Sequence, residues 1–130
     1  MNVGAIAGDT GKGAAIGAAV AEDFDGSVPL VCAPVEARDC VLNTECFSGN
    51  PDSLGAPKFI HIDFKQKVLK GEEITSPILN MVKQTNQLIM QGTELDFGWT
   101  FTLNQTSGKF SAALTNADGA FLLFGSCMPE

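Results

Sequence analysis

The chain has 130 residues, which is enough for one domain with a modest hydrophobic core. Fifteen acidic side chains against eight basic ones give a net charge of −7, and such an acidic surface disfavours binding to nucleic acid or to anionic lipid headgroups. No apolar run approaches the roughly 20 residues that a transmembrane helix needs, so we expect no membrane-spanning segment.

Glycine and alanine dominate the first part of the chain, residues 1–27. The small-residue pairs Gly4/Gly8 and Gly13/Gly17 are spaced for close packing of two backbones. A flexible leader of low complexity fits the same composition. We therefore divide the chain into a leader or assembly segment, residues 1–27, and a β domain, residues 28–130.

The tripeptide Ala19-Val20-Ala21 has the A-x-A form of a signal-peptidase site. The segment before it lacks a basic region, since only Lys12 and the amino terminus are positive. A start chosen inside a longer reading frame is an alternative interpretation of this stretch.

From Pro29 onward, short runs of β-branched and aromatic residues alternate with turn residues, which is typical of β-strands. The clearest run places Phe97, Trp99, Phe101 and Leu103 on one face of a half-buried strand. After it, Asn104–Gly108 is expected to form a hairpin loop in which Gly108 takes a positive φ. The predicted strands are Leu30–Ala37, Phe59–Phe64, Lys67–Lys70, Ile78–Lys83, Gln87–Gln91, Phe97–Leu103, Lys109–Thr115 and Ala120–Cys127.

About eight short strands with brief loops predict an all-β, antiparallel domain. An up-and-down barrel is the first expectation and a sandwich the alternative. In a closed or nearly closed sheet, the first and last strands lie side by side.

The four cysteines, Cys32, Cys40, Cys46 and Cys127, allow three pairings. We expect Cys32–Cys127 to join the first and last strands and Cys40–Cys46 to close a short polar loop. The chain-entropy estimate gives about 4 to 5 kcal/mol for the long loop and about 2 for the short one. A zinc site is disfavoured because no C-x2-C spacing exists. Disulfides place the protein outside the reducing cytosol, in the periplasm or the extracellular space.

His61 and Asp63 share one face of a predicted strand, about 7 Å apart by the two-residue repeat. With Glu72, Glu73 or Glu94 they could form an acid–base pair, but a solvated polar face is the favoured interpretation. A phosphate loop is rejected because Ile6 and Gly13 stand where that motif needs glycine and Ser or Thr. We therefore expect no enzyme activity, no cofactor and no bound metal.

Two further features have ordinary structural interpretations. Trp99 is expected in the core rather than on a binding platform. The sequon Asn104-Gln105-Thr106 is interpreted as turn chemistry rather than as a glycosylation site.

Four stretches carry a resemblance: Val28–Cys40, Leu54–Phe64, Leu88–Leu95 and Ala120–Cys127. Together they resemble small exported bacterial proteins to which we attach no activity, over roughly residues 26–129. The resemblance implies export and gives no site residues.

The sequence thus predicts a non-enzymatic exported β domain that acts by binding. An inhibitor would present Asn43, Thr44 and Glu45 as a loop to a protein partner. A carrier of small apolar ligands would have a cavity lined by Phe and Leu. The alternative is a structural subunit that assembles with copies of itself, through residues 1–27, into a filament or coat.

Overall fold

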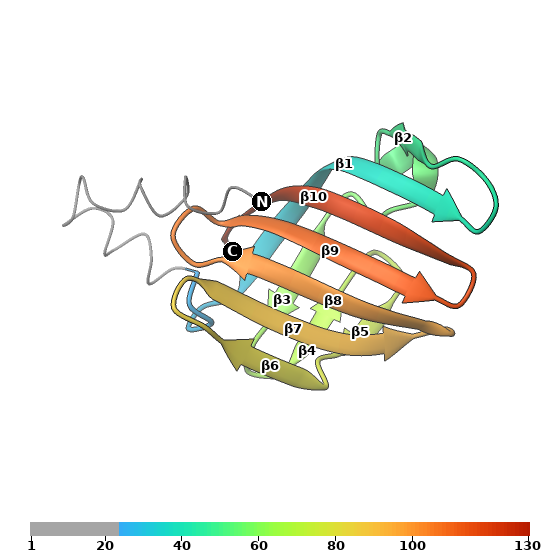
Figure 1. Ribbon diagram of the computed structural model, residues 1–130. Helices are drawn as coiled ribbons and strands as arrows, with labels where there is room; N and C mark the ends of the chain where they lie inside the picture. Colours follow the sequence, from blue (N-terminus) through green and yellow to red (C-terminus); the bar gives the residue numbers. More distant parts are fainter. Residues whose placement is uncertain (1–23) are drawn as a thin grey trace.

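A computed structural model describes residues 24–130, which form one antiparallel sheet (Figure 1). Hydrogen-bonded pairing follows the order β5-β4-β3-β1-β10-β9-β8-β7-β6, with β2 paired to β1. The predicted all-β, antiparallel class is confirmed. In chain order the elements are β1 (Leu30–Val41), β2 (Phe47–Gly49), the 3-10 turn η1 (Asp52–Leu54), β3 (Ile60–Asp63), β4 (Val68–Lys70), β5 (Thr75–Pro77), β6 (Asn80–Lys83), β7 (Gln87–Glu94), β8 (Phe97–Asn104), β9 (Lys109–Asn116) and β10 (Gly119–Pro129).

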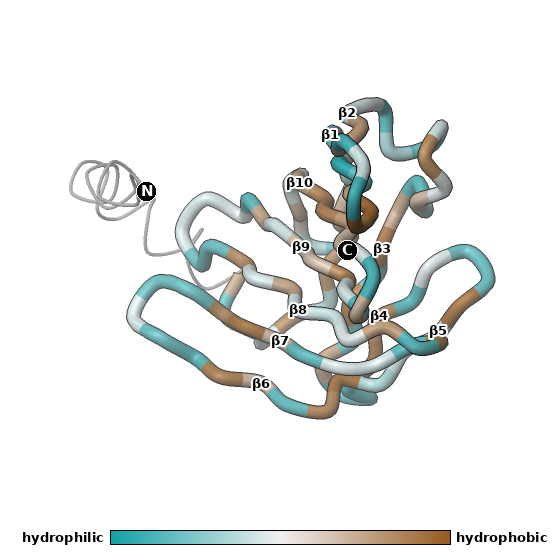
Figure 2. Tube along the Cα trace, turned by 45° about the vertical axis from the view of Figure 1, so that its right-hand side comes forward, coloured by the Kyte–Doolittle hydropathy of each residue, from teal (hydrophilic) through white to brown (hydrophobic). Residues whose placement is uncertain are grey.

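The sheet curls into a half-barrel in which β3, β4 and β5 lie behind β7 and β8 (Figures 1 and 2). Its two outer strands, β5 and β6, are consecutive in the chain. Between them the amide of Ile78 donates to the carbonyl of Lys67, and the amide of Leu79 donates to that of Gln91, both at 2.8 Å. One bent segment therefore joins the two sides of the sheet. All strands belong to one sheet, as expected for the barrel and not for the alternative, a sandwich of two sheets.

The sheet has ten strands rather than about eight. All eight predicted strands are present, and the two additional ones are β2 and β5, of three residues each. Both lack an alternating apolar face of their own, because β2 is largely exposed and β5 contains Pro77. Their extended conformation depends on pairing with β1 and β4.

Apolar side chains fill the end of the half-barrel that holds both Phe24 and the carboxyl terminus. Leu30, Ile62 and Leu103 are fully buried there. Phe24 is only 6% exposed and belongs to the same core, although the expected division at residue 27 places it in the leader. Our predictions for residues 1–23, the small-residue pairs and the signal-peptidase-like tripeptide included, lie outside the described residues.

Both predicted disulfides are present. Cys32 lies directly opposite Cys127 in the β1–β10 register, so this bond joins the first and last strands of the half-barrel. The Cys40–Cys46 bond closes the short loop after β1. Two disulfides in a small domain are typical of proteins that fold outside the reducing cytosol.

The hairpin after β8 follows the prediction. Gly108 has a φ of +78°, and the Asn104 carboxamide oxygen accepts hydrogen bonds from the amides of Thr106 and Ser107, both at 2.8 Å. Asn104 is itself only 4% exposed, so its side chain serves the turn and not the surface.

Strand β1 contains a bulge at Val35. Partners on β10 shift register between Pro34 and Glu36, and Val35 is 71% exposed. An extra residue reverses the alternation of faces along a strand. Leu30 and Cys32 face inward before the bulge, and Ala37 and Asp39 face inward after it.

Candidate functional site

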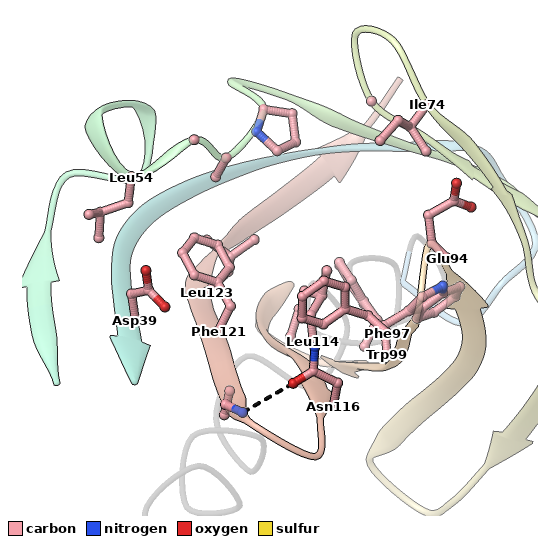
Figure 3. A pocket seen from close by; sticks show the side chains of 18 of the residues that line it. Asp39, Leu54, Ile74, Glu94, Phe97, Trp99, Leu114, Asn116, Phe121 and Leu123 are labelled. Carbon is pink, nitrogen blue, oxygen red and sulfur yellow. Dashed lines mark hydrogen bonds between the residues drawn. The ribbon is translucent and has the colours of Figure 1, made fainter. Parts of the chain in front are cut away.

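A cavity of about 620 Å³ lies at the open end of the half-barrel, away from the end that holds Phe24 and Glu130. Figure 3 shows side chains that line it. We call the open end the mouth; it is formed by the connections β1–β3, β4–β5, β7–β8 and β9–β10. The volume falls within the roughly 300 to 1,000 Å³ of small-molecule sites. Its largest apolar lining residues are Phe97, Trp99, Phe101, Phe121, Leu54, Leu69, Leu114, Leu123, Ile60 and Ile74.

The cavity exists because inward positions near the mouth carry small side chains. Ala112 lies in register between Phe101 on β8 and Leu123 on β10, at the centre of one wall. Ser76 and Ala56 line the cavity from other parts of the fold. Protein interiors are ordinarily packed to the density of organic crystals, so a hollow of this size is a specific feature of the fold.

Stacked aromatic rings separate the cavity from the filled end. Phe101 is 1% exposed and stacks on Phe110, with ring centroids 4.6 Å apart and planes 10° from parallel. Since Phe110 is itself buried, Phe101 has little freedom to move. The pair gives the cavity a rigid base.

Trp99 is fixed in the cavity wall. Its indole Nε1 donates to Ser76 Oγ at 2.9 Å, and this hydroxyl donates onward to the carbonyl of Thr93 at 3.2 Å. The ring lies over Gly92, its partner in the β7–β8 register, where a β-carbon would lie 2.5 Å from Trp99 Cζ2. Trp99 is 6% exposed, as expected of a core residue, and it also lines the cavity.

Three carboxylates line this mainly apolar space: Asp39, Glu94 and Asp118. Glu94 continues the inward row of Leu88, Met90 and Gly92 on β7, whereas Asp39 faces inward because of the bulge. Figure 3 shows Asp39 and Glu94 on opposite sides of the cavity. Within residues 24–130, no hydrogen bond or ion pair engages any of these three carboxylates, and no Lys, Arg or His lines the cavity.

Large apolar side chains also surround the mouth. Val41 at the end of β1 is 51% exposed, and Leu42 and Phe47 in the β1–β3 connection are 63% and 66% exposed. Ile74 in the β4–β5 connection and Leu95 in the β7–β8 turn are 44% and 73% exposed. Figure 2 shows such hydrophobic segments interspersed with hydrophilic ones along the loops.

His61 and Asp63 do not take part in the cavity. The His61 Nδ1 atom lies 2.7 Å from Glu130 Oε2, and Asp63 Oδ1 accepts from the amide of Gln66 at 2.9 Å. Of their expected helpers, Glu72 accepts from the amide of Lys58, and Glu94 alone lines the cavity. Within the described residues, no group of three His, Cys, Asp or Glu side chains could hold a metal ion.

The predicted binding loop, Asn43, Thr44 and Glu45, is exposed at the mouth. Thr44 donates through its amide and hydroxyl to the carbonyl of Val41, at 3.1 and 2.9 Å. The neighbouring amide of Leu42 donates to the carbonyl of Asp118 at 2.8 Å, which attaches the loop to the β9–β10 turn. The loop is therefore held against the rim of the cavity.

Sequence reasoning did not place Asp39 or Glu94 in a cavity. A carboxylate that continues an apolar two-residue repeat was an available signal for Glu94. The sequence holds no such signal for Asp39, because the bulge at Val35 reverses the alternation of faces along β1 before that residue.

Comparison with protein-family models, with curated proteins and with solved structures finds no match for this chain. Across residues 24–130, no helix is long and apolar enough to cross a bilayer.

Proposed function

We propose that this protein binds a small, mainly apolar ligand in the mouth of its half-barrel, as a non-enzymatic carrier in the periplasm or the extracellular space. The cavity of about 620 Å³ carries the proposal, since aromatic and aliphatic side chains form most of its lining. Such composition is typical of sites for small molecules and cofactors.

The favourable free energy of binding comes from removing apolar surface of the ligand and the cavity from water. A ligand that buries about 250 Å² of apolar surface gains about 6 kcal/mol before the cost of association is subtracted. The fixed Trp99 and the Phe101–Phe110 stack reduce that cost because they are already ordered. The two disulfides support the compartment.

The neutral apolar dye N-phenyl-1-naphthylamine provides the test. The chain has a single tryptophan, and it lines the cavity, so a bound dye is expected to quench Trp99 while its own emission rises. A wild-type protein that fails to enhance dye emission would overturn the proposal.

Two adjacent residues on opposite faces of β9 give a matched pair of variants. Ala112 is 7% exposed and lines the cavity, whereas Ala113 is absent from the lining and faces outward. We expect Ala112→Phe to weaken dye binding by about tenfold or more, equal to about 1.4 kcal/mol, and Ala113→Phe to leave it unchanged. Equal effects of both variants would place the dye elsewhere.

The Cys40–Cys46 loop favours a second candidate function, inhibition of a secreted hydrolase. The loop is exposed, closed by a disulfide and attached to the β9–β10 turn, which is the preorganisation that an inhibitory loop needs. Assays of secreted proteases and glycosidases with and without the protein test this candidate. A decrease that Glu45→Ala abolishes supports it, and the absence of any decrease argues against it.

A further inference from the structure

We infer that the ligand carries a positive charge: the cavity is built for an amphiphilic amine, with an apolar body and an ammonium group held at the mouth. This inference rests on the proposed function and specifies the chemistry of the same site.

The lining itself has one sign of charge. Asp39, Glu94 and Asp118 contribute carboxylates, and within residues 24–130 no basic side chain lines the cavity. An apolar ligand that covers these groups removes water from them, which is unfavourable unless the ligand supplies a hydrogen-bond donor or a cation. An ammonium group supplies both. A carboxylate ligand would add a like charge beside Asp39 and Glu94.

The positions of these carboxylates fit a ligand with one charged end. Asp39 lies two residues before the end of β1, and Glu94 ends β7, so both are near the mouth. The base of the cavity is formed instead by Phe101, whose ring stacks on buried Phe110 behind it. An amphiphile therefore fits with its apolar part on the aromatic base and its amine between the two carboxylates.

Charge around the mouth has the same sign. Exposed Glu45 and Asp52 lie in the β1–β3 connection, Glu72 and Glu73 in the β4–β5 connection, and Asp96 in the β7–β8 turn. Three basic side chains lie near the mouth: Lys58, Lys70 and Arg38. Arg38 is ion-paired with Glu36 at 2.6 Å.

The other basic side chains of the described part gather at the filled end. Lys65, Lys67, Lys83 and Lys109 lie on turns or strand ends there, together with Asp25, Asp63 and Glu130. Across residues 24–130, negative charge therefore predominates around the mouth, which steers cations toward the cavity and anions away from it.

Three probes with the same ten-carbon tail isolate the charge of the headgroup: decylamine, 1-decanol and decanoate. Each is added at pH 7, below its micellar range, to wild-type protein loaded with N-phenyl-1-naphthylamine. We expect decylamine to displace the dye about tenfold more tightly than 1-decanol, the size of one charge-assisted hydrogen bond, and decanoate to be the weakest.

Isosteric variants test which carboxylates are responsible. We expect Asp39→Asn combined with Glu94→Gln to remove most of the preference for decylamine, because decylamine binds more weakly while 1-decanol and the dye bind at least as tightly as before, since neutral amides lose less than carboxylates when water is removed from them. Asp96→Asn is the matched control, because Asp96 is exposed at the mouth and absent from the cavity lining. This control is expected to retain the preference.

The outcomes separate the inference from the proposed function. If the dye binds and decanoate or 1-decanol competes as well as decylamine, the positive charge is refuted while the apolar site stands. A preference that survives the double variant also refutes the assigned carboxylates. If the wild-type protein binds neither the dye nor decylamine, both proposals fail.

Discussion

Gly92→Ala is expected to destabilise the protein by displacing Trp99. A β-carbon at this position would lie 2.5 Å from Trp99 Cζ2 and 2.6 Å from the carbonyl oxygen of Pro77. The indole can move away only toward the cavity, which would break the hydrogen bond from Nε1 to buried Ser76. Overpacking in a core costs about 1 to 3 kcal/mol and a lost hydrogen bond about 1, so we expect a loss of about 2 to 4 kcal/mol.

Urea unfolding followed by both Trp99 fluorescence and far-ultraviolet circular dichroism measures this loss. Gly98→Ala is the matched control: Gly98 lies in the same hairpin, opposite Thr93, and no atom lies within 4 Å of the β-carbon built there. We expect Gly98→Ala to stay within about 0.5 kcal/mol of wild type. If Gly92→Ala unfolds at the same urea concentration as the control, with unchanged Trp99 emission, then a β-carbon at position 92 does not displace Trp99.

Two further variant pairs test what holds the fold together. Replacing Cys32 and Cys127 by Ala opens a link that spans 95 residues, and the expected loss is about 4 to 5 kcal/mol, against about 2 for Cys40 and Cys46, which are 6 residues apart. Equal urea midpoints for the two double variants would contradict this order. Ser76→Ala leaves the buried indole N–H of Trp99 without its acceptor, and we expect a loss of about 1 to 3 kcal/mol by thermal unfolding, with a shifted Trp99 emission. Its neighbour Thr75 is exposed, so a Thr75→Ala variant as unstable as Ser76→Ala would show that the hydrogen bond is not responsible.

Most of the fold follows from local patterns. The period of two in Phe97–Leu103 predicts β8, and its inward residues are the expected ones. The two missed strands have no such period: β2 leaves Phe47 66% exposed, and β5 holds Pro77. Each becomes a strand by pairing with the strand that precedes it in the chain, β2 with β1 and β5 with β4.

The type of site, an apolar cavity, was predictable from the sequence, but the carboxylates that line it were not. A carrier was expected to have a cavity lined by Phe and Leu, and such residues do line the mouth. The carboxylates were not found, because Asp39 and Glu94 are 55 positions apart in the chain and share a cavity only when β1 and β7 belong to one curled sheet. His61 was conspicuous as the single histidine of the sequence, yet it lies beside Glu130 at the other end.

The bulge at Val35 has a consequence for how the sequence can change over time. The side chain is 71% exposed, so most substitutions there are tolerable. Loss of the residue itself would join Pro34 directly to Glu36, whose partners Gly125 and Phe124 are already adjacent on β10, so Ala37 and Asp39 would still face inward. Evolution is therefore free both to change residue 35 and to lose it, and related chains should vary in residue type and in length at this one position while the residues equivalent to Ala37 and Asp39 still face inward.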